Sequence, residues 1–248
     1  RTAARQLTHV TGRTDVIAVP PGVSPAPAAQ AHQPPGIVQV GSLGPRKNQL
    51  ASLQALTACR DLAFTATFAG PVADEAYAAR VRAGLAAAVA TWTGPLQGAD
   101  LEGLYAGADL LLNPARAETW GMVITEALAR GVPAIVGAGT GAVEALSSGG
   151  AGGLPGAVVD LDDPDALART VRRWLTDPAL RQQWRDNALQ ARAGLRDWAT
   201  SAAELAGALA GGATVTGHGL LLQRADGLQL PAEIDLQLLR DVNGDVCG

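Results

Sequence analysis

The chain has 248 residues, of which 48% are hydrophobic, 4% aromatic and 17% charged, with 30 glycines and 15 prolines. This composition is typical of a globular protein and excludes a collagen, a disordered polyampholyte and a disulfide scaffold. The formal net charge of -4 is too small for charge alone to predict a surface that binds nucleic acid or an anionic membrane.

In chain order, the first 35 residues mix Pro, Ala and Gly around one short apolar run at residues 16–19, and we interpret residues 1–35 as a linker that enters a domain from elsewhere. From Gly36 onward, strand-like segments alternate with helix-like ones. The strand-like segments are residues 36–43, 62–70, 88–94, 108–114, 132–137 and 156–161. The helix-like segments are residues 48–60, 73–87, 100–108, 121–131, 141–149 and 164–175. This alternation predicts right-handed βαβ crossovers and a doubly wound α/β fold, with a parallel sheet covered on both faces.

Two further helices are predicted at residues 178–195 and 197–210. The pattern changes after Gly211-Gly212, where residues 225–227 (ADG) suit a hairpin turn. We therefore divide the chain into the linker, a domain at 36–195, a C-terminal helix at 196–212 and a tail at 213–248. For the tail, an edge hairpin, the start of a second module and disorder all remain open.

Cysteine and histidine usage gives no metal or disulfide signal. Cys59 and Cys247 lie far apart without a CxxC pair, and the three histidines are scattered without a carboxylate or cysteine at ligand spacing. No segment reaches the roughly 18 apolar residues of a spanning helix, and the first ten residues lack the apolar core of a secretion signal. We predict a cytoplasmic protein without a bound metal.

The first loop of interest follows the strand-like segment that starts at Gly36. Ligands of open parallel sheets bind beyond the carboxyl ends of the strands, and this chain has neither GxGxxG nor GxxxxGK[ST] there. Instead the sequence reads GSLGPRKN over residues 41–48. Arg46 and Lys47, which lie beside glycines, can hold a diphosphate. The planar guanidinium of Arg46 would donate two hydrogen bonds to phosphate oxygens, and Lys47 would act as a point charge. The alternative is a solvated basic turn capped by Asn48.

The second loop follows the strand-like segment that ends at Asn113 and Pro114. It carries Glu118, and Gly121 precedes a helix-like segment that holds Glu126. If the helix starts near Gly121, the backbone N–H groups of residues 122 and 123 point outward, and the helix dipole favours an anion there. The two carboxylates would flank that anion and accept hydrogen bonds from hydroxyls on either side of it.

These motifs resemble the large family of retaining, nucleotide-sugar-dependent glycosyltransferases with the GT-B architecture. Glu118 and Glu126 match its E-x7-E element, with Gly121 at the fourth position. The flanking blocks agree in order: VIAVPPGVS, VGSLGPRKN, ADLLLNPARAETWG, EALARGVPAIVG, GTGAVEAL and GAVVDLDDPDALARTVRRWLTD. The resemblance covers about residues 16–210 and implies that residues 36–195 form the Rossmann-like, nucleotide-sugar-binding C-terminal domain of that architecture, followed by additional helices.

The resemblance also implies roles for individual residues. Glu126 would accept hydrogen bonds from the ribose hydroxyls, and Glu118 would contact the donor sugar near the reacting carbon. Lys47 and Arg46 would neutralise the leaving diphosphate in the transition state, with no cofactor and no metal required. The remaining donor-binding residues would be Gly41, Ser42, Gly121, Met122 and Val123, the last two through their backbone N–H groups.

The chain departs from the family pattern in two ways. Many relatives carry Arg where Ser42 stands, so we expect Arg46 to supply that charge. The family's N-terminal, acceptor-binding domain has no room before Val16, and the chain starts with Arg1 rather than Met. We therefore expect the donor-binding half of a glycosyltransferase, inactive by itself and completed by the missing acceptor domain.

Two other functions remain open. One is a module that binds a nucleotide sugar without transferring it. The other is a glycoside hydrolase that uses Glu118 and Glu126 as acid and as nucleophile or base. The residues do not identify the donor base, the sugar or the acceptor.

Overall fold

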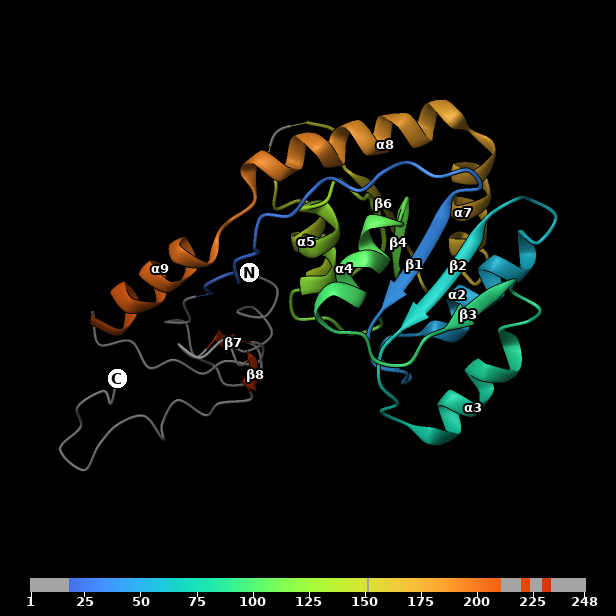
Figure 1. Ribbon diagram of the computed structural model, residues 1–248, viewed down its shortest axis with the longest axis horizontal. Helices are drawn as coiled ribbons and strands as arrows, with labels where there is room; N and C mark the ends of the chain where they lie inside the picture. Colours follow the sequence, from blue (N-terminus) through green and yellow to red (C-terminus); the bar gives the residue numbers. More distant parts are fainter. Residues whose placement is uncertain (1–17, 151, 211–219, 224–228, 233–248) are drawn as a thin grey trace.

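A six-stranded sheet with the strand order β3-β2-β1-β4-β5-β6 forms the centre of the molecule, and all of its neighbouring strands are parallel (Figure 1). The computed structural model describes residues 18–150, 152–210, 220–223 and 229–232. The strands of this sheet are β1 (Gly36–Val40), β2 (Thr65–Ala69), β3 (Ala90–Trp92), β4 (Leu110–Asn113), β5 (Ala134–Gly137) and β6 (Gly156–Val159). The predicted doubly wound α/β fold is confirmed, with each strand inside its predicted segment.

The helices alternate with these strands as predicted. They are α2 (Gln49–Ala58), α3 (Glu75–Gly84), α4 (Gly98–Ala106), α5 (Met122–Leu128), α6 (Gly141–Leu146), α7 (Ala166–Thr176), α8 (Pro178–Ala191) and α9 (Trp198–Ala210). The helix predicted at 178–195 is shorter than expected, because α8 ends at Ala191 and a 3-10 turn, η1 (Arg192–Gly194), follows. Gly194 packs against the main chain of Gly149 so closely that a Cβ there would lie 2.2 Å from the Gly149 carbonyl oxygen.

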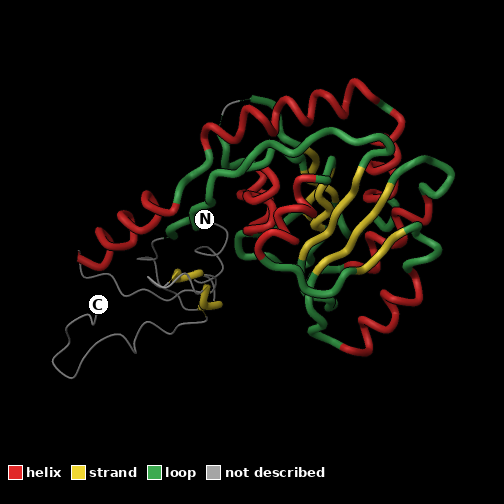
Figure 2. The backbone as a smooth tube through the Cα atoms, in the orientation of Figure 1, coloured by secondary structure: helices red, strands yellow, loops and turns green. Residues whose placement is uncertain are grey.

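Helices cover both faces of the sheet (Figure 2), and the buried side chains form two hydrophobic layers. Successive side chains of a strand point to opposite faces, so Ile37 joins one layer and Val38 the other. The first layer packs under α2, α3 and α7 and includes Leu56, Phe68 and Trp174. The second packs under α4, α5 and α6. Strands buried on both faces explain the nearly continuous apolar runs of the sequence.

The described part of the linker runs beside α8 before it enters β1 (Figure 1). Arg192 of η1 donates from Nη2 to the Ala26 carbonyl at 2.8 Å. The buried carboxylate of Asp109 accepts hydrogen bonds from the backbone N–H groups of Gly36, at 2.8 Å, and His32, at 3.2 Å. Asp109 therefore fixes the point at which the linker becomes the central strand.

The tail contains a two-stranded antiparallel sheet of β7 (Leu220–Gln223) and β8 (Gln229–Ala232). Of the three alternatives left open for the tail, this pairing agrees with a hairpin, but the hairpin forms a separate sheet and does not extend the edge of the six-stranded one. The turn at 225–227, residues 16 and 17 of the linker's apolar run and the rest of the tail lie outside the described residues. Among the helices of the described residues, none is both long and apolar enough to cross a membrane.

We expect Asp109→Ala to lower the free energy of unfolding by about 2–4 kcal/mol, because buried N–H groups lose their acceptor. Asp162→Ala is the matched control, since the side chain of Asp162 is 94% exposed and should contribute less than about 1 kcal/mol. Urea denaturation of both variants gives the two values. Equal losses would contradict this role of Asp109.

Candidate functional site

The loops that follow β1 and β4 meet at the carboxyl end of the sheet. The two strands are neighbours, so residues 41–48 and residues 114–121 leave the sheet side by side. The backbone N–H of Arg116 donates to the carbonyl of Arg46 at 2.9 Å. Lys47 Nζ lies 2.5 Å from Glu118 Oε2 and donates to it. Two motifs that are 71 residues apart in the sequence are thus joined by one ion pair.

This ion pair is buried: the side chains of Lys47 and Glu118 are only 13% and 7% exposed. Removing two charges from water is costly, and close pairing offsets the cost. For Lys47, the alternative of a solvated basic turn is therefore wrong, because its ammonium group turns inward to the carboxylate.

Glycines and buried amides shape the loop after β1. Gly41 has a φ of +149°, and Gly70 packs so closely on it that a Cβ at Gly70 would lie 2.1 Å from the Gly41 carbonyl oxygen. Gln39 Nε2 donates to the carbonyl of Lys47 at 2.9 Å. Gln49 Nε2 donates to the carbonyl of Ser42 at 2.8 Å. These contacts hold the main chain on either side of Lys47.

Asn48 and Arg46 differ in their surroundings. Asn48 has a left-handed backbone, with φ 56° and ψ 41°, and its side chain makes no capping hydrogen bond to α2. The predicted cap is therefore wrong, because capping side chains require an extended backbone at that position. Arg46 is exposed, and its guanidinium forms no ion pair with any residue that the structure describes. Arg46 can therefore reach a bound anion.

Helix α5 begins at Met122, as expected, with Gly121 as its N-cap at a φ of +91°. A Cβ at Gly121 would lie 2.7 Å from Ile124 Cδ1 and 3.3 Å from Glu118 Cγ, and the positive φ is a backbone conformation that favours glycine. Met122 and Val123 are half-buried. The N–H groups of a first helical turn have no acceptor within the helix and are open to an anion.

Gly141, the first residue of α6, contacts the main chain of the loop that carries Glu118. The backbone N–H of Gly141 donates to the carbonyl of Glu118 at 2.7 Å. A Cβ at Gly141 would lie 1.9 Å from the carbonyl oxygen of Thr119, which leaves no space for a larger residue. The main chain of Glu118 is thus fixed on α6 while its side chain faces Lys47.

Glu126 lies on α5 and is half-buried rather than enclosed in the hydrophobic layer. Its Oε2 accepts a hydrogen bond from the hydroxyl of Tyr105, on α4, at 2.8 Å. Burial, followed by the charge of Glu126, raises the pKa of Tyr105 well above its ordinary value, so the hydroxyl remains a donor. Arg130 Nη1 donates to the carbonyl of Glu126 at 3.0 Å.

Sequence reasoning missed Tyr105, Gln39 and Gln49 as supports of this site. Gln39 carried a signal, because it is a polar residue within the short strand GIVQV, where burial on both faces requires a hydrogen-bond partner. Tyr105 carried none, since an aromatic residue on a core-facing helix is ordinary packing.

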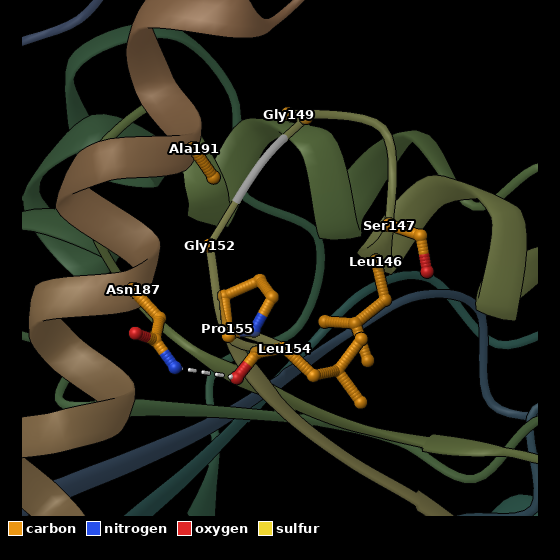
Figure 3. A pocket seen from close by; sticks show the side chains of 10 residues that line it. Leu146, Ser147, Gly149, Gly152, Leu154, Pro155, Asn187 and Ala191 are labelled. Atoms are coloured by element: carbon orange, nitrogen blue, oxygen red, sulfur yellow. Dashed lines mark hydrogen bonds between the residues drawn. The ribbon is translucent and has the colours of Figure 1, made fainter.

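Two cavities are present that neither Lys47 nor Glu118 lines. The larger, of about 470 Å³, is lined by the linker, by residues of α6 and α9, and by Trp120. The smaller, of about 180 Å³, lies between α8 and the glycine-rich segment that leads into β6, where Asn187 Nδ2 donates to the Leu154 carbonyl at 3.0 Å (Figure 3). Because that segment precedes β6, the smaller cavity lies at the opposite end of the sheet from the Lys47–Glu118 pair. The described residues hold no group of three His, Cys, Asp or Glu side chains placed to bind a metal.

Residues 25–191 match the family described as Glycosyl transferases group 1. The chain belongs to this family. The match includes the ion pair, the start of α5 and Glu126, so the candidate site is part of the family's shared domain.

The chain is also similar to individual proteins. The chain is 40% identical over 87 residues to a D-inositol 3-phosphate glycosyltransferase of Salinispora arenicola, a match that covers 35% of this chain and 18% of the relative. Among solved structures, the Anabaena protein HepE in complex with UDP and glucose is 22% identical, with a TM-score of 0.61 over 71% of this chain and 48% of that one. Sucrose-phosphate synthase of Thermosynechococcus elongatus is 19% identical, with a TM-score of 0.69 over 84% of this chain and 56% of that one. The chain thus spans about half the length of these solved structures.

The buried ion pair predicts coupling in a double-mutant cycle. We expect Lys47→Ala and Glu118→Ala each to lower stability, and the double variant to lose about 1–3 kcal/mol less than the sum, because each single change leaves a buried charge unpaired. Denaturant unfolding of the four proteins measures the coupling.

The exposed pair of Arg82 and Glu75, whose side chains are 39% and 73% exposed, serves as the control. Its coupling should stay below about 0.5 kcal/mol. A coupling for Lys47 and Glu118 no larger than that of the control would contradict the importance of the buried pair.

Proposed function

We propose that this group 1 chain binds a nucleotide-diphosphate sugar and forms the donor-binding, C-terminal half of a retaining glycosyltransferase. The observation that carries the proposal is the buried contact between Lys47 and Glu118, at the carboxyl edge of a parallel sheet and beside the N-terminus of α5. A cation, a carboxylate and free backbone N–H groups are the partners that a sugar diphosphate needs.

The diphosphate would lie between the loop after β1 and the start of α5. The Lys47 ammonium group has three N–H donors, of which Glu118 uses one, so the others remain for phosphate oxygens. Arg46 is exposed and adds a second cation at the same loop. The N–H groups of Met122 and Val123 would complete the cradle, and Gly41 and Gly121 keep side chains out of it.

These groups would act in the transition state. As the bond between the anomeric carbon and the phosphate oxygen breaks, the electron pair goes to the diphosphate, whose negative charge grows. Lys47 and Arg46 stabilise that charge, which raises turnover rather than only ground-state binding. Glu118, held beside Lys47, would contact the donor sugar, and Glu126 would accept hydrogen bonds from the ribose. Transfer with retention at the anomeric carbon follows from the family resemblance of the E-x7-E element.

The acceptor would bind mainly to a separate N-terminal domain. Two facts support this assignment: the chain spans about half the length of similar solved structures, and its described residues form one doubly wound domain with a C-terminal helix and a hairpin. The UDP and glucose in HepE support a nucleotide sugar as donor. We keep a cytoplasmic location as a prediction.

A binding module without transferase activity is the second candidate, because the contacts that support the proposal concern binding of a nucleotide sugar and not its transfer. Both candidates predict nucleotide-sugar binding, and they differ in transfer once the acceptor domain is supplied. Family membership gives the glycoside hydrolase interpretation no support.

Calorimetry with UDP, ADP, GDP and their glucose conjugates tests donor binding. We expect one nucleotide class to bind in a one-to-one ratio, because the cradle is formed without further domains. A folded sample that binds none of them would refute the proposal. Binding that yields no sugar transfer after addition of the acceptor domain would favour the binding module.

Lys47→Ala should weaken binding of the preferred nucleoside diphosphate by about 1.5–3 kcal/mol, the range of a charge-assisted hydrogen bond. Arg60→Ala is the matched control, since Arg60 is exposed at the far end of α2 from the loop. It should leave the affinity unchanged. Titration calorimetry measures both variants, and an unaltered affinity in Lys47→Ala would remove this residue from the site.

A further inference from the structure

Glu126, the carboxylate that we assign to the ribose, accepts a hydrogen bond from the buried hydroxyl of Tyr105. Tyr105 is 1% exposed, and its hydroxyl donates to Glu126 Oε2 at 2.8 Å. We propose that Tyr105 is a positioning residue, which holds Oε2 of Glu126 so that Oε1 is presented to the ribose hydroxyls of the bound nucleotide. This inference rests on the proposed function, since it requires a nucleotide at the site.

The ring of Tyr105 is held firmly enough to fix its hydroxyl. It belongs to the hydrophobic layer under α4, α5 and α6, together with Val38, Ile124 and Leu128. Residues in close-packed interiors occupy single rotamers, so the hydroxyl has a fixed position relative to α5. The same hydroxyl lies 3.5 Å from the carbonyl of Val123, one helical turn before Glu126.

Arg130 contacts both the ring of Tyr105 and the main chain of Glu126. Its guanidinium lies 4.9 Å from the centre of the Tyr105 ring, and Nη1 donates to the main-chain carbonyl of Glu126. Arg130 therefore contacts the ring and the backbone of α5, while the carboxylate is held by the tyrosine hydroxyl. The three residues thus connect α4 to α5.

A neutral donor suits this task better than a cation would. The hydroxyl orients the carboxylate without cancelling its charge, so Oε1 remains a strong acceptor for a ribose hydroxyl. Burial and the neighbouring carboxylate raise the pKa of Tyr105 well above its ordinary value, and the donor therefore persists at neutral and moderately alkaline pH. Holding the side chain before binding also reduces the rotamer entropy that is lost with the ligand.

A purely structural hydrogen bond and a positioning one have different consequences. The first affects only stability, because any buried tyrosine hydroxyl needs a partner. The second also affects how strongly the site prefers a ribose with both hydroxyls over one that lacks a hydroxyl. The ratio of those two affinities is thus the decisive quantity, since a general loss of stability or of phosphate binding cancels from it.

The experiment measures this ratio by calorimetry with UDP, ADP and GDP and with their 2′-deoxy and 3′-deoxy forms. In the unaltered chain, the ribose form should bind more tightly. Tyr105→Phe keeps the ring and its contact with Arg130 but removes the hydroxyl. The ratio should fall about threefold to tenfold, the equivalent of one hydrogen bond, while the affinity for the deoxy form changes less than about twofold.

Tyr77→Phe is the matched control, because the chain has only two tyrosines and both are buried with hydrogen-bonded hydroxyls. The Tyr77 hydroxyl accepts from the backbone N–H of Leu50 at 3.0 Å, away from Glu126. Its removal should leave the ratio unchanged. In a Glu126→Ala background, Tyr105→Phe should likewise have no further effect on the ratio, because the carboxylate that it positions is gone.

The possible outcomes distinguish a failure of the proposed function from a failure of the positioning role of Tyr105. Failure of the unaltered, folded chain to bind any of the nucleotides refutes the proposed function itself. Binding with a clear ribose preference that Tyr105→Phe retains overturns only the positioning role. Binding without a ribose preference overturns the positioning role together with the assignment of Glu126. Thermal unfolding of each variant confirms that the titrated sample is folded, and a ratio that falls equally in Tyr77→Phe also counts against the inference.

Discussion

The buried ion pair of Lys47 and Glu118 is the contact on which the candidate site depends. Each side chain alone would be a desolvated charge, at a cost of several kcal/mol, so each of the loops after β1 and β4 buries its charge at a lower cost when the other is present. The hydrogen bond from Arg116 to the carbonyl of Arg46 fixes the same two loops through their main chains. The pair therefore both stabilises the carboxyl edge of the sheet and gathers the groups that a sugar diphosphate would contact.

Close backbone approach is the second constraint on this edge. Gly70 lies against Gly41, and Gly141 lies against Thr119, each at a distance that excludes a Cβ. Gly121 has a φ of +91°, a left-handed backbone that favours glycine. Loops packed this closely have little room to rearrange, so the site is largely formed before a ligand binds. Preorganisation of this kind lowers the ordering cost of binding and directs fixed dipoles at the ligand.

The sequence alone was sufficient to predict the fold and the position of one element of the candidate site, the start of α5. Alternating apolar segments predicted the strands and helices, and the glycine before MVITEAL predicted the start of α5. The contact of Lys47 with Glu118 could not be predicted from the residues alone, because it depends on β1 and β4 being neighbours, and alternation of strands and helices is compatible with several strand orders. The predicted cap at Asn48 was wrong for a local reason, its left-handed backbone, which the residue type permits but does not require. Tyr105 gave no signal because its helix face is ordinary core.

The charge arrangement at this edge explains how a neutral ion pair can still favour an anion. The charges of Lys47 and Glu118 cancel at long range, but a diphosphate bound through the two remaining N–H donors of Lys47 would lie closer to the ammonium group than to the carboxylate. Arg46 is outside the pair and adds a positive charge that nothing in the described chain neutralises by an ion pair. At the other side of the proposed cradle, Oε2 of Glu126 accepts a hydrogen bond from the neutral hydroxyl of Tyr105, and in the proposed complex Oε1 would accept from the ribose hydroxyls. In the proposed complex, the cationic groups of the loop after β1 would thus face the phosphates, and the carboxylate of Glu126 would face the ribose hydroxyls.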